Sequence, residues 1–207
     1  GGFGAPAQNG IVADRAGSIA IRSTWHYPIR PAGATGLTIF DGSLGANDWR
    51  GSWPLERYPQ SFDPPQGFLA SANQEPIDPR QNPDYLASDQ NFDPWRAVHI
   101  NRLLRADSAV TPDAMRRYQT DPGSARADRF VPFFVDAAQA ASAGGQGSAS
   151  LDSAVRQLAA WDRRYTRESE TVALFEGAMR ELVRRTWDEL APPGGRVPLG
   201  VAWGTGV

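Results

Sequence analysis

Asn73 ends a short segment, GFLASA, in which apolar residues alternate as they do along a half-buried strand. A carboxamide that leaves water must make its hydrogen bonds elsewhere, because an unpaired polar group is costly to bury. One interpretation is that Asn73 caps the end of the strand and bonds to the proline-rich loop after it. The other is that its amide is there to bind a ligand. The residue types alone leave both interpretations open.

Arg96 lies in the first turn of an expected helix. At helical spacing it shares a face with Ile100, Leu103 and Leu104. A guanidinium on a core-facing stripe must find partners, because an unpaired buried charge is destabilising. Either the side chain extends past the helix end to water, or it directs its donors at a polar site near the sheet edge, where Asn73 would also lie.

Composition excludes much other catalytic chemistry. The chain has no cysteine and no lysine, so thiolate metal sites, cysteine nucleophiles and Schiff bases are excluded. The two histidines are His26 and His99, and the sequence holds no G-x-S-x-G, H-E-x-x-H or G-x-G-x-x-G motif. His99 is flanked by Val98 and Ile100 in the expected helix, which favours a packing role.

The overall composition is that of a globular protein with no nucleic-acid or membrane partner. The 207 residues are 41% hydrophobic and 21% charged, with a net charge of −2. That charge gives no electrostatic footprint for nucleic acid or an anionic membrane. No apolar run is long enough to span a bilayer, and no signal peptide opens the chain, so we expect any targeting segment to have been removed.

The expected elements change along the chain from strands to helices, which predicts an α+β fold. Residues 1–92 are rich in glycine and proline, with a predicted hairpin (11–13 and 18–23 about a turn at 14–17), further strands at 37–40 and 68–72, and long loops. Residues 93–191 have helical periodicity, and 192–207 form an irregular tail.

The helical part contains clear start and stop signals. Asp93-Pro94 and Thr111-Pro112 each place a capping residue before a proline. A third helix is expected after Ser124, broken or kinked at Pro132. Residues 140–150 are predicted to form a linker of small residues. An apolar stripe follows on residues 151–158. A second stripe marks a long helix, which Ser169 is expected to cap and which is expected to end near residue 190.

Several motifs occur in a recognisable order. The first is QNGIVADRAGSIAI, a version of a Q-N-x-x-x-A-D-x-x-G-x-I-x hairpin, and HYPIRPAG follows it. DWRGSWPLERYPQSFDPPQGFLASANQ is similar to W-x-G-x-x-P…P…N-P-x-x-G-f-x-x-x-N-N. Four further motifs complete the set: DYLASD, WRAVHINRLL, TPDAMRRYQTDPGSARA and WDRRYTRESETVALFE. Over nearly the whole chain this order resembles the penicillin acylase (penicillin amidase) family of N-terminal-nucleophile hydrolases.

The resemblance implies a part of that family's αββα sandwich and a role for three residues. Asn73 falls on the oxyanion-hole asparagine, whose side-chain N–H stabilises a tetrahedral intermediate. Arg96 falls on the active-site arginine, which holds the surroundings of the nucleophile in place, and we expect both residues to line one pocket. Asp89 falls on a carboxylate that ligates a structural Ca²⁺, most of whose oxygen ligands would come from elsewhere.

The family's nucleophile is a serine at the N-terminus of the mature β chain, freed by autoproteolysis, with its own amine as base. Residue 1 here is glycine, which has no Oγ, and the quoted motifs belong to the middle of a β chain. We therefore expect an internal fragment of a periplasmic acylase for penicillins, N-acyl-homoserine lactones or related amides, with no organic cofactor. Its partners would be the α chain and the rest of the β chain, and alone it would be inactive.

The alternative hypothesis is a non-catalytic binding or scaffold domain of the same architecture. The residue that begins the natural mature chain would distinguish the two. In either case strands taken from a large sandwich leave open edges, and open edges recruit partners. We therefore expect the isolated chain to form a homodimer through its sheet edges.

Overall fold

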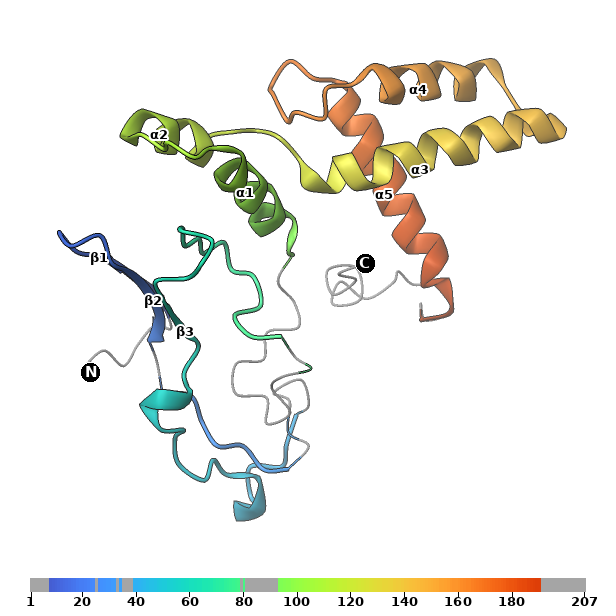
Figure 1. Cartoon of the computed structure of the whole chain (residues 1–207). Helices are drawn as coiled ribbons and strands as arrows, with labels where there is room; N and C mark the ends of the chain where they lie inside the picture. The colour runs from blue at the N-terminus through green and yellow to red at the C-terminus, as the bar shows by residue number, and fades with distance from the viewer. Residues whose placement is uncertain are drawn as a thin grey trace. The chain divides into compact units, whose positions relative to one another are not determined.

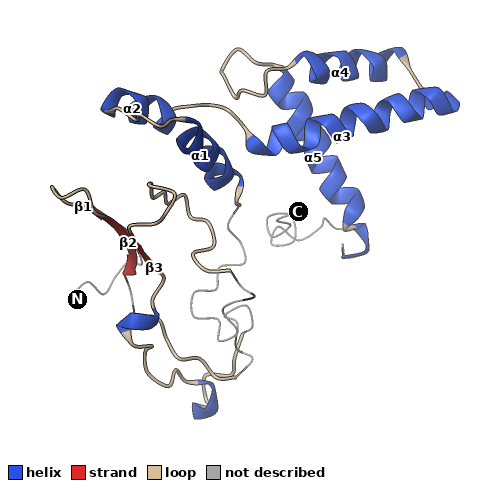
Figure 2. Cartoon of the chain, viewed as in Figure 1, coloured by secondary structure: helices blue, strands red, loops and turns tan. Residues whose placement is uncertain are grey.

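The computed structural model describes residues 8–24, 26–32, 34, 39–78, 80 and 93–190. The chain divides into two compact units, Gly1–Phe92 and Asp93–Val207. In the described residues, strands occur in the first unit and all the long helices in the second (Figures 1 and 2). The fold is therefore α+β, as the sequence predicts.

The sheet of the first unit has three antiparallel strands in the order β1-β2-β3: β1 is Gln8–Ala13, β2 is Ile19–Thr24 and β3 is Gln60–Phe62. The predicted hairpin is confirmed, and Ile11 pairs with Ile21. Asp14 fixes the turn, because its Oδ1 accepts the N–H groups of Ala16 and Ser18, both at 2.9 Å.

Strand β3 was not predicted, and the strand predicted at residues 37–40 is absent from its described part. Only three residues long, β3 is too short to show an alternating pattern, and Asp63 (φ 40°) turns the chain directly after it. The Oδ1 atom of Asp63 accepts the N–H of Ile19 at 2.7 Å, which ties that turn to β2. Of the strand expected at 37–40, residues 39 and 40 are not in a strand and 37–38 lie outside the described residues.

The long loops of the first unit pack on one another. The N–H of Ile29 donates to the Gly51 carbonyl at 2.9 Å, and the N–H of Trp53 donates to the Tyr27 carbonyl at 2.8 Å. Tyr58, 4% exposed, meets Tyr27 edge-on with ring centroids 4.8 Å apart. Two short 3-10 helices, η1 (Gly45–Asn47) and η2 (Leu55–Arg57), complete these loops.

Residues 93–190, the described part of the second unit, contain five α-helices: α1 (Trp95–Ala106), α2 (Pro112–Gln119), α3 (Ala125–Ala141), α4 (Ala149–Ala160) and α5 (Thr171–Thr186). Thr111, Ser124 and Ser148 each cap a helix, because their side-chain oxygens accept the N–H three residues on at 3.1 Å. The linker expected at 140–150 contains a π-helical turn, η4 (Ser142–Gln146), and a 3-10 turn, η5 (Asp188–Leu190), follows α5.

Two predicted helix boundaries were wrong. Pro132 lies inside α3 without ending it, so the predicted break is absent, while the alternative of a kink there stays a prediction. Its neighbour Val131 is 1% exposed, so core packing holds the helix across the missing hydrogen bond. Ser169 does not cap α5 with its side chain. Its backbone carbonyl instead accepts the Val172 N–H at 3.4 Å, and the helix begins at Thr171.

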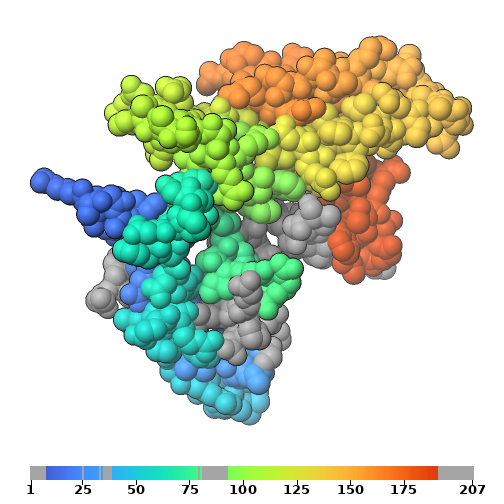
Figure 3. Space-filling view, in the orientation of Figure 1, coloured from blue at the N-terminus to red at the C-terminus, as the bar shows by residue number. Residues whose placement is uncertain are grey.

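The core of the second unit lies where α3, α4 and α5 meet. Figure 3 shows the surfaces of α3 and α4 side by side, and Figure 1 shows α5 crossing α3. The buried side chains come from all three helices and the loop after α4: Ala127, Val131, Leu158, Trp161, Phe175 and Met179. No helix in the described part of the chain is long and apolar enough to cross a membrane.

Candidate active site

The segment that leads to Asn73 is not a strand, contrary to the prediction for residues 68–72. The side chain of Gln74 satisfies its backbone instead. Its Oε1 accepts the Ala72 N–H at 2.7 Å, and its Nε2 donates to the Ala70 carbonyl at 2.9 Å. A single side chain therefore supplies both the acceptor and the donor that a neighbouring strand would have given.

Asn73 itself has a left-handed backbone, with φ 60°, and it is exposed. The expectation of a buried amide was therefore wrong, since the buried residue is its neighbour Ala72, 5% exposed. Asparagine adopts this conformation more readily than most residues. Such conformations cluster at functional sites, where the surrounding structure holds them.

Asn9 attaches this segment to the hairpin. Its Nδ2 donates to the Ser71 hydroxyl at 2.8 Å, and its Oδ1 accepts from the Ser23 hydroxyl at 2.7 Å. Ser23 is 5% exposed, so the link is anchored in β2. Sequence reasoning missed Asn9. The available signal was an asparagine in a strand, where its low β-propensity calls for another role.

Arg96 lies in the first turn of α1 and is exposed, so the expectation that it lies on the core-facing stripe was wrong. The buried residues of α1 are Ala97, His99 and Leu104, while Ile100 is half-buried. This rotation of the helix leaves Arg96 exposed, and a charge is less costly there than in the core.

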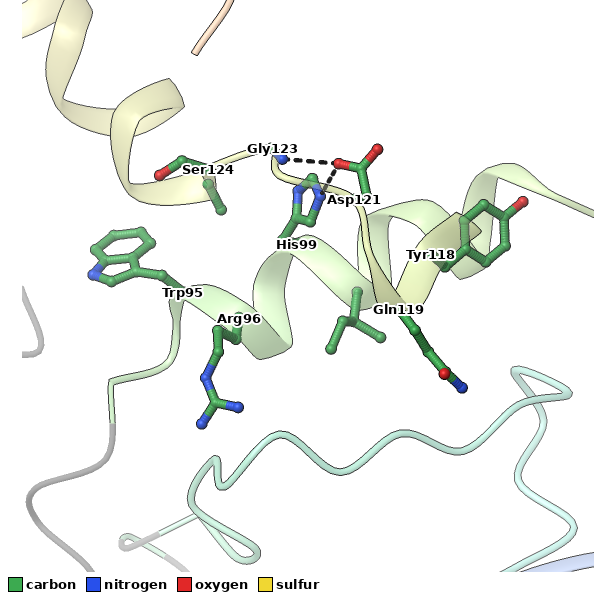
Figure 4. Close-up of a pocket in the computed structure, with 10 residues that line it drawn as sticks. Trp95, Arg96, His99, Tyr118, Gln119, Asp121, Gly123 and Ser124 are labelled. Atoms are coloured by element: carbon green, nitrogen blue, oxygen red, sulfur yellow. Dashed lines mark hydrogen bonds and ion pairs between the residues drawn. The ribbon is translucent and has the colours of Figure 1, made fainter. Parts of the chain in front are cut away.

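Arg96 lines a pocket of about 270 Å³ in the second unit. Figure 4 shows the side chains around it, which come from α1, the end of α2, the loop between α2 and α3, and the start of α3. The labelled residues are Trp95, Arg96, His99, Tyr118, Gln119, Asp121, Gly123 and Ser124. Asn73 belongs to the other unit, and its placement with Arg96 in one pocket stays a prediction.

His99 is the buried polar residue of this pocket, at 8% exposed, in line with its expected packing role. Its Nδ1 is 2.9 Å from Nη2 of Arg102, and its Nε2 is 2.8 Å from Oδ1 of Asp121. A guanidinium can only donate, so Nδ1 is the acceptor and Nε2 carries the proton that is donated to Asp121. The contacts thus define a neutral imidazole with its hydrogen on Nε2.

Asp121 holds a negative charge beside this imidazole. Partial burial opposes its ionisation, but hydrogen bonds from Arg164 (2.8 Å), the Gly123 N–H (2.9 Å) and His99 outweigh that effect and lower the pKa of Asp121 to about 2. The carboxylate is therefore charged at any ordinary pH.

We expect the free energy of unfolding of the 207-residue chain to fall as the pH is lowered from about 4 to about 2. The pKa of an unperturbed aspartate is 3.8, and the pKa of Asp121 in the folded chain is about 2. Asp121 therefore makes its full contribution to the free energy of unfolding above about pH 4. That contribution is lost as the pH falls and the folded carboxylate is protonated. Urea unfolding at a series of pH values measures this slope.

The control is Glu181, whose pKa is also lowered to about 2 by hydrogen bonds from Arg184 and Arg185. Glu181→Gln removes that contribution on the exposed face of α5, and Asp121→Asn removes the one in the pocket. A slope in this pH range that Asp121→Asn leaves unchanged would contradict the prediction.

Asp89, the expected calcium ligand, lies outside the described residues. Among the residues that are described, no three His, Asp or Glu side chains cluster as metal ligands would. Because Ca²⁺ takes six to eight oxygen ligands, the described residues do not by themselves fit such a site. The calcium assignment stays a prediction.

Comparison with known proteins identifies the family. The profile of the family described as penicillin amidase matches residues 1–203. The chain belongs to the penicillin amidase family. It is 30% identical to penicillin acylase 2 proenzyme of Pseudomonas sp. (strain SE83) over 208 residues, which cover 97% of this chain and 26% of that protein.

Other family members show a similar degree of likeness. Penicillin G acylase of Escherichia coli is 30% identical over 74% of this chain and 18% of its own length. The acyl-homoserine lactone acylase QuiP of Pseudomonas aeruginosa is 30% identical over 83% of this chain and 21% of its own length. The chain thus spans about a quarter or less of the curated relatives that it matches.

A solved structure shows the same fold. The thermostable penicillin G acylase of Alcaligenes faecalis superposes with a TM-score of 0.65 at 20% identity, over 92% of this chain and 34% of that one. The family inferred from the order of motifs and the α+β fold class inferred from the order of strands and helices are therefore confirmed.

Proposed function

We propose that the protein of which this chain is part is an acylase that hydrolyses the linear amide bond of a small acylated amine. The observation that carries the proposal is the penicillin amidase match over residues 1–203. The curated relatives of the chain include penicillin acylases and an acyl-homoserine lactone acylase. The substrate class is accordingly a penicillin or an N-acyl amide.

In the proposed mechanism, an N-terminal serine supplied from outside these 207 residues attacks the amide carbonyl, and its own amine takes up the proton. The side-chain N–H of Asn73 and a backbone N–H stabilise the oxyanion of the tetrahedral intermediate. The amine then leaves with a proton, and water hydrolyses the acyl-enzyme to the carboxylic acid. Arg96 holds the surroundings of the nucleophile in place.

The geometry around Asn73 supports its role. Its backbone is held in the left-handed region by a segment whose bonds run through Gln74 and Asn9. These contacts hold the backbone that carries the amide. An oxyanion hole is effective when its donors are positioned before negative charge develops on the substrate, and a held backbone contributes to that positioning.

The partners and location follow from the same proposal. The remainder of the acylase, an α chain and the rest of the β chain, would complete the site, and the whole protein would be periplasmic. Asp89 would contribute one ligand to a structural Ca²⁺. In the isolated chain, β1 is exposed along its whole length, which supports association with a second copy through this edge.

The test compares the complete acylase with the 207-residue chain. We expect the complete protein to release a carboxylic acid from penicillin G or an N-acyl-homoserine lactone, and the chain alone to release none, because it has no N-terminal serine. Absence of turnover by the complete protein on such amides would refute the proposal.

Light scattering of the same isolated chain at high concentration tests the expected dimer, and a strictly monomeric profile would argue against it.

A further inference from the structure

Two loops of the second unit are joined by their backbones beside the pocket. Gly123, between α2 and α3, forms an antiparallel bridge with Arg164, between α4 and α5. The N–H of Ser124 donates to the Arg163 carbonyl at 3.1 Å, and the N–H of Tyr165 donates to the Pro122 carbonyl at 2.8 Å. The start of α3 is thereby fixed to the loop that precedes α5.

A chain of side chains connects these two loops to α1. His99 of α1 bonds to Asp121 at 2.8 Å, and the other oxygen of Asp121 accepts from Arg164 at 2.8 Å. Beside it, Arg102 of α1 pairs with Asp128 of α3 at 2.5 Å. Both oxygens of Asp121 and both nitrogens of His99 are thus used, so α1 cannot turn about its axis without breaking bonds to two other segments.

Gly123 makes this arrangement possible. A Cβ at position 123 would lie 2.5 Å from Cε1 and 2.9 Å from Nε2 of His99, and 2.8 Å from Oδ1 of Asp121. Such distances are too short for any real contact, so even alanine would displace the imidazole or the carboxylate. The backbone here approaches the ring as closely as only a glycine permits.

Arg96 lies one helical turn before His99 on α1, and both line the same pocket. Figure 4 shows the His99 ring directed at Asp121 and Gly123, while the Arg96 side chain leaves the helix on another side. Because a helix turns as a rigid body, the bonds of His99 also set the direction in which Arg96 leaves it.

We propose that His99, Asp121 and Arg164, with the close backbone of Gly123, form a clamp that positions Arg96 for the reaction. The inference rests on the proposed function for the role of Arg96, and it adds three positioning residues to that site. They act through α1 and do not contact the substrate.

The clamp itself is tested in the 207-residue chain by the tautomer of His99. Nitrogen NMR of the imidazoles is simple here, because the chain has only two histidines and His26→Gln assigns the signals. We expect His99 at neutral pH to show Nε2 protonated and Nδ1 as acceptor. We expect Gly123→Ala and Asp121→Asn to shift the signal of the Nε2 proton, because each variant displaces or weakens the acceptor of that proton. A ring with its proton on Nδ1, or an Nε2 signal that neither variant shifts, would overturn the clamp.

The matched control is Gly177→Ala in α5, where an added Cβ meets nothing within 4 Å. It makes the same chemical change in the same unit and should leave the His99 signals as they are. If Gly123→Ala does not fold, Asp121→Asn serves in its place, because it keeps the side-chain shape and removes the charge.

The positioning role is tested in the complete acylase by combining variants. We expect Gly123→Ala to lower kcat by about tenfold to a hundredfold with little change in KM, since a small misplacement of an active-site group has effects of this size. In an acylase that already carries Arg96→Ala, adding Gly123→Ala should lower kcat by less than about a further twofold. The reason is that the effect of Gly123→Ala is transmitted through Arg96.

The outcomes separate the two proposals. Equal losses from Gly123→Ala with and without Arg96 would overturn the positioning role while leaving amide hydrolysis intact. An unchanged kcat in Gly123→Ala would overturn it as well. Failure of the unaltered acylase to turn over any amide would refute the proposed function instead, and the His99 tautomer would still report on the clamp.

Discussion

Replacing Asn73 with glycine in the complete acylase is expected to lower kcat by about 10² to 10³ and to change KM little, the usual effect of removing one oxyanion-hole donor. The reason is that the amide is proposed to bind the oxyanion, which exists only in the transition state and intermediate. Steady-state hydrolysis of penicillin G or an N-acyl-homoserine lactone measures both constants.

Glycine is the informative substitution because Asn73 has φ 60°. Glycine adopts this conformation without strain, so Asn73→Gly removes the amide and keeps the backbone. Asn73→Ala removes the amide and adds the cost of a left-handed alanine, about 1 kcal/mol. We expect both variants to lose the same factor in kcat, and Asn73→Gly with unaltered kcat would exclude the oxyanion role.

A second control separates the amide from the segment that carries it. Gln74→Ala removes the bonds to the Ala72 N–H and the Ala70 carbonyl, which hold the chain before Asn73. This change keeps the amide but loosens its support, so kcat should fall less than in Asn73→Gly. Equal losses would show that the segment, and not the amide, carries the effect.

Local signals predicted much of the fold. The hairpin follows from alternating residues about an Asp-containing turn, and two helices begin after Thr111 and Ser124 because these side chains cap them. The segment 68–72 was misread because the side chain of Gln74, not a neighbouring strand, satisfies its backbone. That bond forms only in the folded chain, so alternation alone could not reveal it.

The candidate site was predicted unevenly for a similar reason. Asn73 and Arg96 were chosen by residue type and by resemblance, but both are exposed. Asn73 does not end a strand, because Gln74 satisfies the backbone before it. Arg96 is exposed because the rotation of α1 is decided by contacts with other segments. His99 and Asp121 are 22 positions apart, and Asp121 and Arg164 are 43 apart. No local pattern indicates that such distant residues meet, so the clamp could be found only in the structure.

Phe175→Ala is expected to lower the free energy of unfolding of the helical unit by about 3 to 5 kcal/mol, the usual cost of truncating a buried phenylalanine. Phe175 of α5 is 0% exposed. Its ring lies 5.5 Å from that of Trp161 and 6.1 Å from that of Phe134, so truncation leaves a cavity between α5, α3 and the loop after α4. Urea unfolding followed by circular dichroism at 222 nm measures it.

Phe133→Ala is the matched control, since Phe133 of α3 is 53% exposed. The Cζ atom of Arg129 lies over the Phe133 ring, 5.0 Å from the ring centroid. Loss of the Phe133 ring should cost about 1 kcal/mol or less, because an exposed cation–π contact is worth about 0.5 to 1 kcal/mol. The contrast identifies what holds α5 in place. If Phe175→Ala costs no more than Phe133→Ala, the helices do not share the core described here, and the loops that form the clamp would lack the support on which its rigidity depends.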